Sequence, residues 1–529
     1  MKKKKHFLAG KFILSVLVAL ACVMSGCSPV VPEEIMETPA PQPSNQFSST
    51  GTMDAITIAI PEGKLGSNPL TERSRSMGSF YRLIYESLIG LDDKGAYVGI
   101  LAQSWSFNTE EDTLTLMLRK GVKWQDGRDF TAQDVVHTLN LIKDAGNDSI
   151  YYNLMEYLQS WESDADGNVV IKLSQCFYGV LSALVFPVVP FGVQLGDISV
   201  TTAGTGPYKI ADASDPKKIR LDANANWWKK APAIQTIFAQ VTPDNDASLA
   251  SLGIRQIDAL QTSSLTTEQY RVAGAANAYE YTTQFYEFLA PNIAKGGILS
   301  QKNVRQAIAY AINRREIVSN VYINHAVLAD TPVSPGSFLY QGKLLTYAHN
   351  TQKAKELLEA ALGKNWVYYG EPLQLLTHQS LDDNLRLETA NLIAQYLALV
   401  GIPVEVKALE WDAFVTEAAK KEYDLLLGGW YLTPVPDLSF AFESGAKENW
   451  SGYSSTEMDN LLALLLEQGT EKGMVNVAEQ IQQQFLDDVP FISLYFRTHT
   501  LMTNNTLRGV GRVDEDNAYQ TLPQWTFNR

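Results

Sequence analysis

Side chains that could perform catalysis or bind metals are scattered along this chain, without the spacing that local active sites require. The sequence has no phosphate-binding glycine-rich loop, no His-Glu-x-x-His helix and no Gly-x-Ser-x-Gly turn. No two of the six histidines stand at metal-ligand spacing; they are His6, His137, His325, His349, His378 and His499. We therefore expect a protein that is not an enzyme and that has no cofactor and no metal site.

One segment is better suited to holding a ligand than to transforming it. Residues 424–430 (Asp-Leu-Leu-Leu-Gly-Gly-Trp) form an apolar run that ends in glycines, which predicts a buried strand. Ligands of open α/β sheets lie beyond the carboxyl ends of strands, and paired glycines let a backbone approach a ligand closely. A strand followed by a tight turn and a packed tryptophan is an equally good interpretation of this composition.

Hydrophobic periodicity predicts the elements that position this segment. Alternating apolar residues predict half-buried strands at 56–60, 114–118 and 169–173, the last after a hairpin turn at 164–168. Stripes of apolar residues at helical spacing predict five helices, at 135–142, 304–312, 385–399, 458–465 and 477–485. Thr131 with Asp134 forms a capping box before the first of these helices. The mixture of strands and helices indicates an α/β protein.

The N-terminus is predicted to direct the chain out of the cytoplasm. Four lysines at 2–5 precede an apolar stretch at 12–23, which is typical of a signal peptide covering 1–26. Met24-Ser25-Gly26-Cys27 resembles the bacterial lipobox, in which Cys27 would be acylated and become the mature N-terminus. Residues 27–51 are rich in Pro, Ser and Glu, so we expect a flexible linker behind the lipid anchor. The alternative is an ordinary secretory signal with an incidental cysteine.

Charge and cysteine content exclude other classes. The formal net charge of the 529 residues is −15, and the predicted signal peptide holds five lysines and no acids, so the rest is more acidic still. Such a surface repels phosphate backbones, and we expect no nucleic-acid partner. Cys176 is the only cysteine beyond residue 27, so no internal disulfide can form there, and we interpret Cys176 as a small buried apolar residue.

Several motifs together resemble the oligopeptide- and dipeptide-binding proteins of bacterial importers, known as solute-binding protein family 5. Each motif is weak alone, but their order and spacing make the match specific over about residue 52 to the end. The motifs are LIYESL (83–88), LAQSW (101–105), LRKGVKW (118–124), TAQDV (131–135), GTGPY (204–208), NVRQAI (303–308), YDLLLGGW (423–430) and VPFI (489–492).

The resemblance implies a two-lobed periplasmic-binding-protein-like fold of type II, cluster C. Its lobes are hinged by crossover strands, carry an extra domain and close over a ligand. The implied layout is domain I at 52–92, 198–284 and 501–529, domain II at 93–197, and domain III at 285–500.

The resemblance also implies a groove in which main-chain hydrogen bonds from flanking strands hold an extended peptide. Trp411 precedes Trp430 by nineteen residues, the spacing of a groove tryptophan in the oligopeptide binders, although it could simply cover the core. The expected ligand-binding residues are Trp411, Gly429, Trp430, Tyr431, Thr433, Asp437, Ser74, Arg75 and Tyr495.

Two positions depart from the pattern of the family. Peptide binders carry, three residues after the motif tryptophan, an Asp that pairs with the ligand's ammonium group; here that residue is Thr433. Ala418 stands where the oligopeptide binders have an Arg. Asp437 could replace the missing acid from the same loop, and Arg73 and Arg75 could instead favour an acidic ligand group.

We therefore expect a monomeric extracytoplasmic lipoprotein on the outer face of the cell membrane. It captures a small ligand, a short peptide above all, and delivers it to the permease subunits of an ABC importer. An oligosaccharide, an opine or a metal chelate is the alternative ligand within the same transporter class. A secreted hydrolase, or a sensor or adhesin without transport, is the alternative from another class.

Overall fold

The computed structural model describes residues 55–92, 94–199, 201–342, 347–380, 384–433 and 436–528. The predicted signal peptide, the linker 27–51 and the lipidation site Cys27 lie outside the described residues. The chain divides into two units, 1–50 and 51–529, and the fold below is that of the second unit alone. No helix in the described ranges combines the length and apolar character that crossing a membrane requires.

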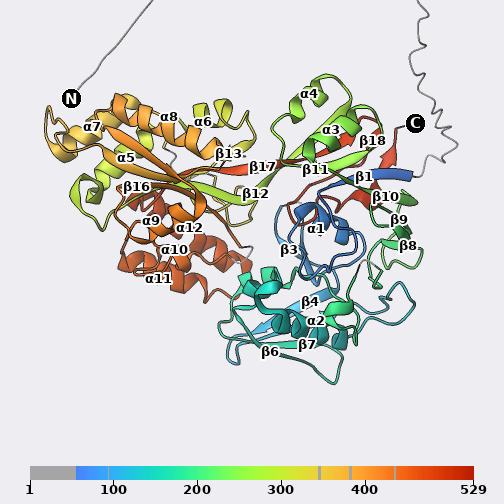
Figure 1. Ribbon diagram of the computed structural model, residues 1–529. Coiled ribbons are helices and arrows are strands. Elements are labelled where there is room, and N and C mark those ends of the chain that lie inside the picture. Colours follow the sequence, from blue (N-terminus) through green and yellow to red (C-terminus); the bar gives the residue numbers. More distant parts are fainter. Residues whose placement is uncertain are drawn as a thin grey trace, which may run out of the picture. The chain divides into compact units, whose positions relative to one another are not determined.

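One large sheet of eleven strands forms the frame of this unit (Figure 1). Ten strands lie side by side and β13 (Ala326–Leu328) pairs separately with β17. The ten strands, in spatial order, are β15 (Val404–Leu409), β14 (Leu373–His378), β16 (Leu425–Tyr431), β12 (Ala276–Pro291), β17 (Ile492–Asn504), β11 (Ala259–Thr262), β1 (Ala55–Pro61), β10 (Thr236–Thr242), β9 (Lys218–Ala223) and β8 (Tyr208–Asp215).

The remaining described strands form three small sheets. A four-stranded antiparallel sheet has the order β4 (Ala102–Asn108), β5 (Thr113–Leu118), β7 (Val169–Leu173) and β6 (Leu158–Ser163). Two ribbons pair β2 (Ile89–Leu91) with β3 (Tyr97–Gly99), and β18 (Leu507–Arg508) with β19 (Thr526–Phe527). The predicted hairpin turn at 164–168 therefore joins β6 to β7 as expected.

Twelve α-helices occur in the described ranges. They are α1 (Arg75–Tyr81), α2 (Ala132–Ala145), α3 (Asn245–Gly253), α4 (Thr267–Val272), α5 (Lys302–Ala311), α6 (Arg314–Asn320), α7 (Thr351–Leu362), α8 (Leu385–Leu399), α9 (Trp411–Ala419), α10 (Ser439–Phe442), α11 (Thr456–Leu465) and α12 (Glu471–Asp488). The five predicted apolar stripes lie on α2, α5, α8, α11 and α12. The capping box is also confirmed, because Asp134 accepts from both the backbone N–H and the hydroxyl of Thr131.

The predicted strand at 424–430 is confirmed as β16, and it is buried because helices cover both faces of the sheet around it. Figure 1 places α5, α7 and α8 on one side of β16 and α10, α11 and α12 on the other. Leu425 and Leu427 contribute to one apolar cluster, with Val304 and Ile308 of α5. Leu426 lies in the other cluster. A continuous apolar run is what a strand covered on both faces requires.

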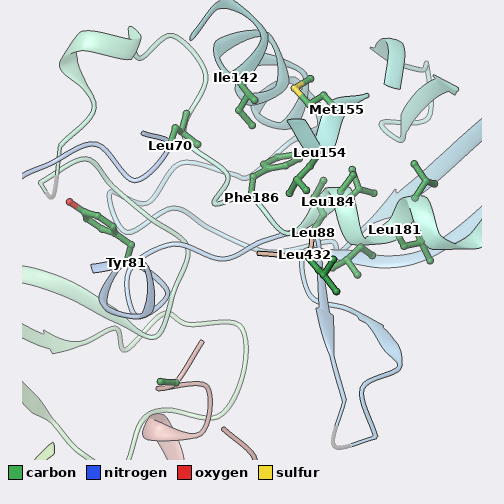
Figure 2. Close-up of a cluster of buried hydrophobic side chains, with 14 of the residues drawn as sticks. Leu70, Tyr81, Leu88, Ile142, Leu154, Met155, Leu181, Leu184, Phe186 and Leu432 are labelled. Atoms are coloured by element: carbon green, nitrogen blue, oxygen red, sulfur yellow. The ribbon is translucent and has the colours of Figure 1, made fainter. Parts of the chain in front are cut away.

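The larger apolar cluster extends from the four-stranded sheet into the large one. Figure 2 shows part of it, with Phe186 among Leu88, Leu154 and Leu184, and with Leu432, which follows β16, in the same cluster. Cys176 also lies in this cluster with a free thiol, as its interpretation as a small apolar residue predicted.

Two long strands join the halves of the large sheet. On one side β14, β15 and β16 run parallel to one another, and on the other side β1, β10 and β11 do the same. The 16-residue β12 and the 13-residue β17 pair antiparallel between them and belong to both halves. These are the crossover strands that the resemblance implied. Their pairing is interrupted between Thr282 and Tyr286, where a bulge shifts the register.

Candidate ligand-binding site

The strand register brings the carboxyl ends of both parallel halves to the middle of β12 and β17. Strand β16 ends at Tyr431, opposite Phe285 of β12. Strand β11 ends at Thr262, opposite Thr500 of β17. Each half therefore points its carboxyl ends at the other half, across the central residues of the crossover strands. Ligands of open α/β sheets bind beyond such ends, so this region is the candidate site.

Several of the predicted binding residues lie at these carboxyl ends. Ser74, in the connection that follows β1, caps α1 by accepting from the N–H of Met77. Trp411 begins α9 just after β15, while Tyr431 and Thr433 end or follow β16. Residues from separate motifs thus follow the carboxyl ends of parallel strands in the two halves of the sheet.

Arg75 and Tyr431 connect the two halves directly. The guanidinium carbon of Arg75 lies 4.8 Å from the centroid of the Tyr431 ring, a cation–π distance. Arg75 belongs to α1 beside one half of the sheet, and Tyr431 is the last residue of β16 in the other. The sequence prediction placed both residues at the ligand, and the structure brings them into contact with each other.

Two adjoining cavities lie against the middle of β12. The larger has a volume of about 440 Å³ and is lined by Glu280 to Thr282 of β12, the loop at 336–338 and the segment 511–516. The smaller, of about 90 Å³, is lined by Thr433 and Asp437 among others. Both cavities share Gln284, Ser334 and Ser337 as lining residues. They form a mixed polar and apolar space of the kind that holds small ligands.

Acidic side chains dominate the charge of the larger cavity. Its charged lining residues are Glu280, Arg512, Asp514, Glu515 and Asp516. Arg512 donates from Nε to Asp514 at 2.7 Å. Glu515 lies 3.1 Å from Arg75, and burial raises the pKa of its carboxyl from the ordinary 4.5 to about 7. The sequence prediction missed this acid, since no periodic pattern marks the segment around it.

Asp437, expected as a replacement for the missing ammonium-binding acid, has protein partners in this structure. Its Oδ2 accepts from the hydroxyl of Tyr157 at 2.6 Å, and its Oδ1 accepts from the N–H of Ser439 at 2.8 Å. Tyr157 belongs to the connection before β6, so this bond links the four-stranded sheet to the loop after β16. A ligand would have to compete with Tyr157 for this carboxylate.

Trp430 lies in an aromatic cluster at one face of the large sheet. Its ring centroid is 4.3 Å from that of Phe288, 5.3 Å from that of Phe491 and 5.1 Å from that of Phe440. The side chain is half-buried, so the packed-tryptophan interpretation describes most of its ring. Phe440, which is partly exposed, also lines the smaller cavity and connects this cluster to the site.

Gly429 lies against a buried group of charges on the other face. A Cβ at this position would come within 2.9 Å of Nη2 of Arg386 and 3.0 Å of Oε2 of Glu287. Arg386 and Arg497 both pair with the fully buried Glu287. The glycine is therefore required by the local packing, whatever else it contacts.

Trp411 and Tyr495 differ sharply in exposure. Trp411 is 57% exposed and its ring meets that of His378 edge-on, with centroids 5.3 Å apart. An exposed tryptophan at a strand end remains available to a ligand. Tyr495 is 0% exposed, and its hydroxyl bonds to that of Tyr322 at 3.0 Å. The structure thus places Tyr495 in the core and not at the cavities.

Comparison with known proteins identifies the family. Residues 96–453 match the sequence profile of the bacterial extracellular solute-binding proteins, family 5 (middle region). The chain belongs to this family. Family 5 proteins are solute-binding proteins, and the two-lobed type II fold described above is theirs.

Relatives and solved structures extend the match over nearly the whole chain. The oligopeptide-binding protein AppA of Bacillus subtilis is 25% identical over 99% of both chains. The structure of AppA with a nonapeptide matches 90% of this chain and 99% of the AppA chain, at a TM-score of 0.62. The dipeptide-binding protein of Escherichia coli is 26% identical over 67% of this chain and 72% of its own. The structure of HbpA2 from Haemophilus parasuis, at 20% identity, covers 89% of this chain and 99% of its own at a TM-score of 0.79.

Proposed function

We propose that this family 5 protein captures short peptides and presents them to the permease subunits of an ABC importer. The observation that carries the proposal is the acid-lined cavity where the carboxyl ends of both parallel halves meet. Exposed strand ends supply main-chain donors and acceptors for an extended chain, and the acids suit a cationic ammonium group. The names of AppA and of the dipeptide-binding protein support a peptide as the ligand.

The cellular setting of the proposal follows from the N-terminus. The protein acts outside the cytoplasm, held at the outer face of the membrane by acylated Cys27 and the linker 27–51. It acts as a monomer that releases its ligand chemically unchanged. Replacing Cys27 with Ala should move the protein from the membrane fraction to the soluble fraction, and retention in the membrane would contradict the anchor.

Native mass spectrometry of the purified unit 51–529, followed by a thermal-shift screen, tests the ligand class. Peptides of two to nine residues should raise the melting temperature and be recovered with unaltered mass, because a ligand that binds the native state stabilises it by mass action. If peptides of every length fail while oligosaccharides raise the melting temperature, the peptide proposal is lost.

Two variants assign the binding to the proposed site. Trp411→Ala removes an exposed ring just beyond the carboxyl end of β15, so it should weaken peptide binding without lowering the melting temperature of the free protein. Tyr369→Ala is the matched control, since Tyr369 is 91% exposed and precedes β14, at the amino end of that strand and not at its carboxyl end. Equal affinity in both variants would place the peptide elsewhere.

A further inference from the structure

Glu515 is held at the centre of the candidate site by the backbone of β12. Its Oε2 accepts from the N–H of Gln284 at 2.7 Å, and its side chain is 7% exposed. Gln284 lies within the bulge of β12, so its N–H is directed to this carboxylate and not to the neighbouring strand. The carboxylate therefore has a fixed position in the wall of the 440 Å³ cavity.

The second oxygen of this carboxylate lacks a well-directed donor. Nε of Arg75 is 3.1 Å from Oε1, and the Tyr431 hydroxyl also interacts with this carboxyl group, yet no donor in the described part of the chain has the geometry of a hydrogen bond to Oε1. Arg75 instead places its guanidinium over the ring of Tyr431. The ion pair with Arg75 offsets part of the cost of burying this oxygen, and a well-directed ligand donor would offset more of it.

The surrounding charges favour a cation over an anion. Glu280, Asp514, Glu515 and Asp516 line the cavity, whereas Arg512 is its one basic lining residue and Arg75 stands beside it. Arg512 is also bonded to Asp514. A ligand cation would enter a site with excess negative charge, while a ligand carboxylate would face several acids.

Glu515 also lies close to the loop that follows β16. The carbonyl of Gln284 accepts from the N–H of Leu432 at 2.9 Å, while its N–H bonds to Glu515. One residue of β12 thus connects the carboxylate to Leu432, the immediate neighbour of Thr433. An acid on the C-terminal segment occupies the region where the loop itself supplies only a neutral threonine.

We propose that Glu515 binds the cationic group of the ligand, which for a peptide is its terminal ammonium. The ammonium donates to Oε1 while Gln284 continues to hold Oε2. This inference rests on the proposed function, because it assumes a ligand with a free amino group. Glu515 of the C-terminal segment therefore selects for a free amino group, and Asp437 and Thr433 do not.

Isothermal titration with one peptide and its N-acetylated form tests the inference. The wild-type protein should bind the free amino form at least about tenfold more tightly. Glu515→Gln should keep the bond from Gln284 but lose most of this preference. Glu268→Gln, the same change at an exposed acid that lines neither cavity, should retain it. Thermal unfolding of each variant checks that it is folded.

A second variant separates a lost site from a damaged fold. Thr433→Asp in the Glu515→Gln background restores a carboxylate to the same region, so it should recover the preference for the free amino form. Equal binding of both peptide forms by the wild type, or an unchanged preference in Glu515→Gln, would overturn the inference while leaving peptide capture intact. If neither form binds the wild type, the proposed function fails first and the inference fails with it.

Discussion

Arg386 holds the buried carboxylate of Glu287 through two parallel hydrogen bonds, from Nε to Oε2 at 3.0 Å and from Nη2 to Oε1 at 2.9 Å. Arg497 adds a third contact, with Nη2 2.7 Å from Oε1. The residues come from β12, α8 and β17, so this group of charges fastens a helix to both crossover strands. Buried charges of this kind are compatible with a stable fold only while each keeps its counter-ion, because removing one partner leaves an uncompensated buried charge.

Glu287→Gln should destabilise the fold strongly, because it leaves two arginines without their buried counter-ion. We expect a loss of about 3–5 kcal/mol in the free energy of unfolding, measured by urea denaturation. Glu268→Gln is the control, since it breaks the exposed pair with Arg271 and should leave the midpoint unchanged. Similar midpoints for wild type and Glu287→Gln would contradict a structural role for this group.

Gly429→Ala should be destabilising although it adds a single methyl group. The new Cβ would lie 2.9 Å from the carbonyl oxygen of Tyr286 and equally close to Nη2 of Arg386, and neither the strand backbone nor the paired guanidinium has room to move. Overpacking of this kind costs about 1–3 kcal/mol, which thermal unfolding can resolve. Gly196→Ala, where a Cβ meets nothing within 4 Å, should unfold like the wild type.

Tyr157→Phe should loosen the contact between the four-stranded sheet and the loop after β16. The change removes the hydroxyl that donates to Asp437 but keeps the ring, whose centroid is 4.9 Å from that of Phe177. A hydrogen bond to a charged acceptor contributes about 1.5–3 kcal/mol to holding the two parts together. Without this bond the two parts should separate more readily, so the ligand-free variant should show a larger radius of gyration by small-angle scattering. An unchanged radius would mean that this bond does not hold the two parts together.

Glu515 should make stability depend on pH between about 4.5 and 7. Burial raises the pKa of this carboxyl from 4.5 to about 7, so the folded protein keeps a proton that the unfolded chain releases. Its stabilising contribution is complete below pH 4.5 and is lost as the pH rises through 7, by at most about 3 kcal/mol. Glu515→Gln should flatten this part of the curve of unfolding free energy against pH. An unaltered slope would contradict the raised pKa.

The sequence predicted what depends on local periodicity and motif order. The apolar run at 424–430 favoured a strand covered on both faces, and the stripes at 135–142 and 477–485 favoured helices packed on one side. Trp430 was ambiguous because an exposed and a packed tryptophan leave the same composition. Its contact with Phe288 depends on strand pairing, which periodicity alone does not determine.

The site charges could not be predicted because their partners are distant in sequence. Glu515 and Gln284 are 231 residues apart, and Glu287 and Arg386 are 99 residues apart. Both contacts depend on β12, whose pairing with β16 and β17 brings separate parts of the chain together. Asp437 looked available in the sequence for the same reason, since Tyr157 lies 280 residues before it.

The bulge in β12 lies in the crossover strands that connect the two halves of the large sheet. Between Thr282 and Tyr286 the ladder to β17 is interrupted, and a bulge of this kind bends the strand and increases its local twist. Gln284 lies within this bulge, and its N–H donates to the carboxylate of Glu515. If Glu515 binds the ligand ammonium group as proposed, the ligand and the irregular segment of β12 are connected through this one side chain.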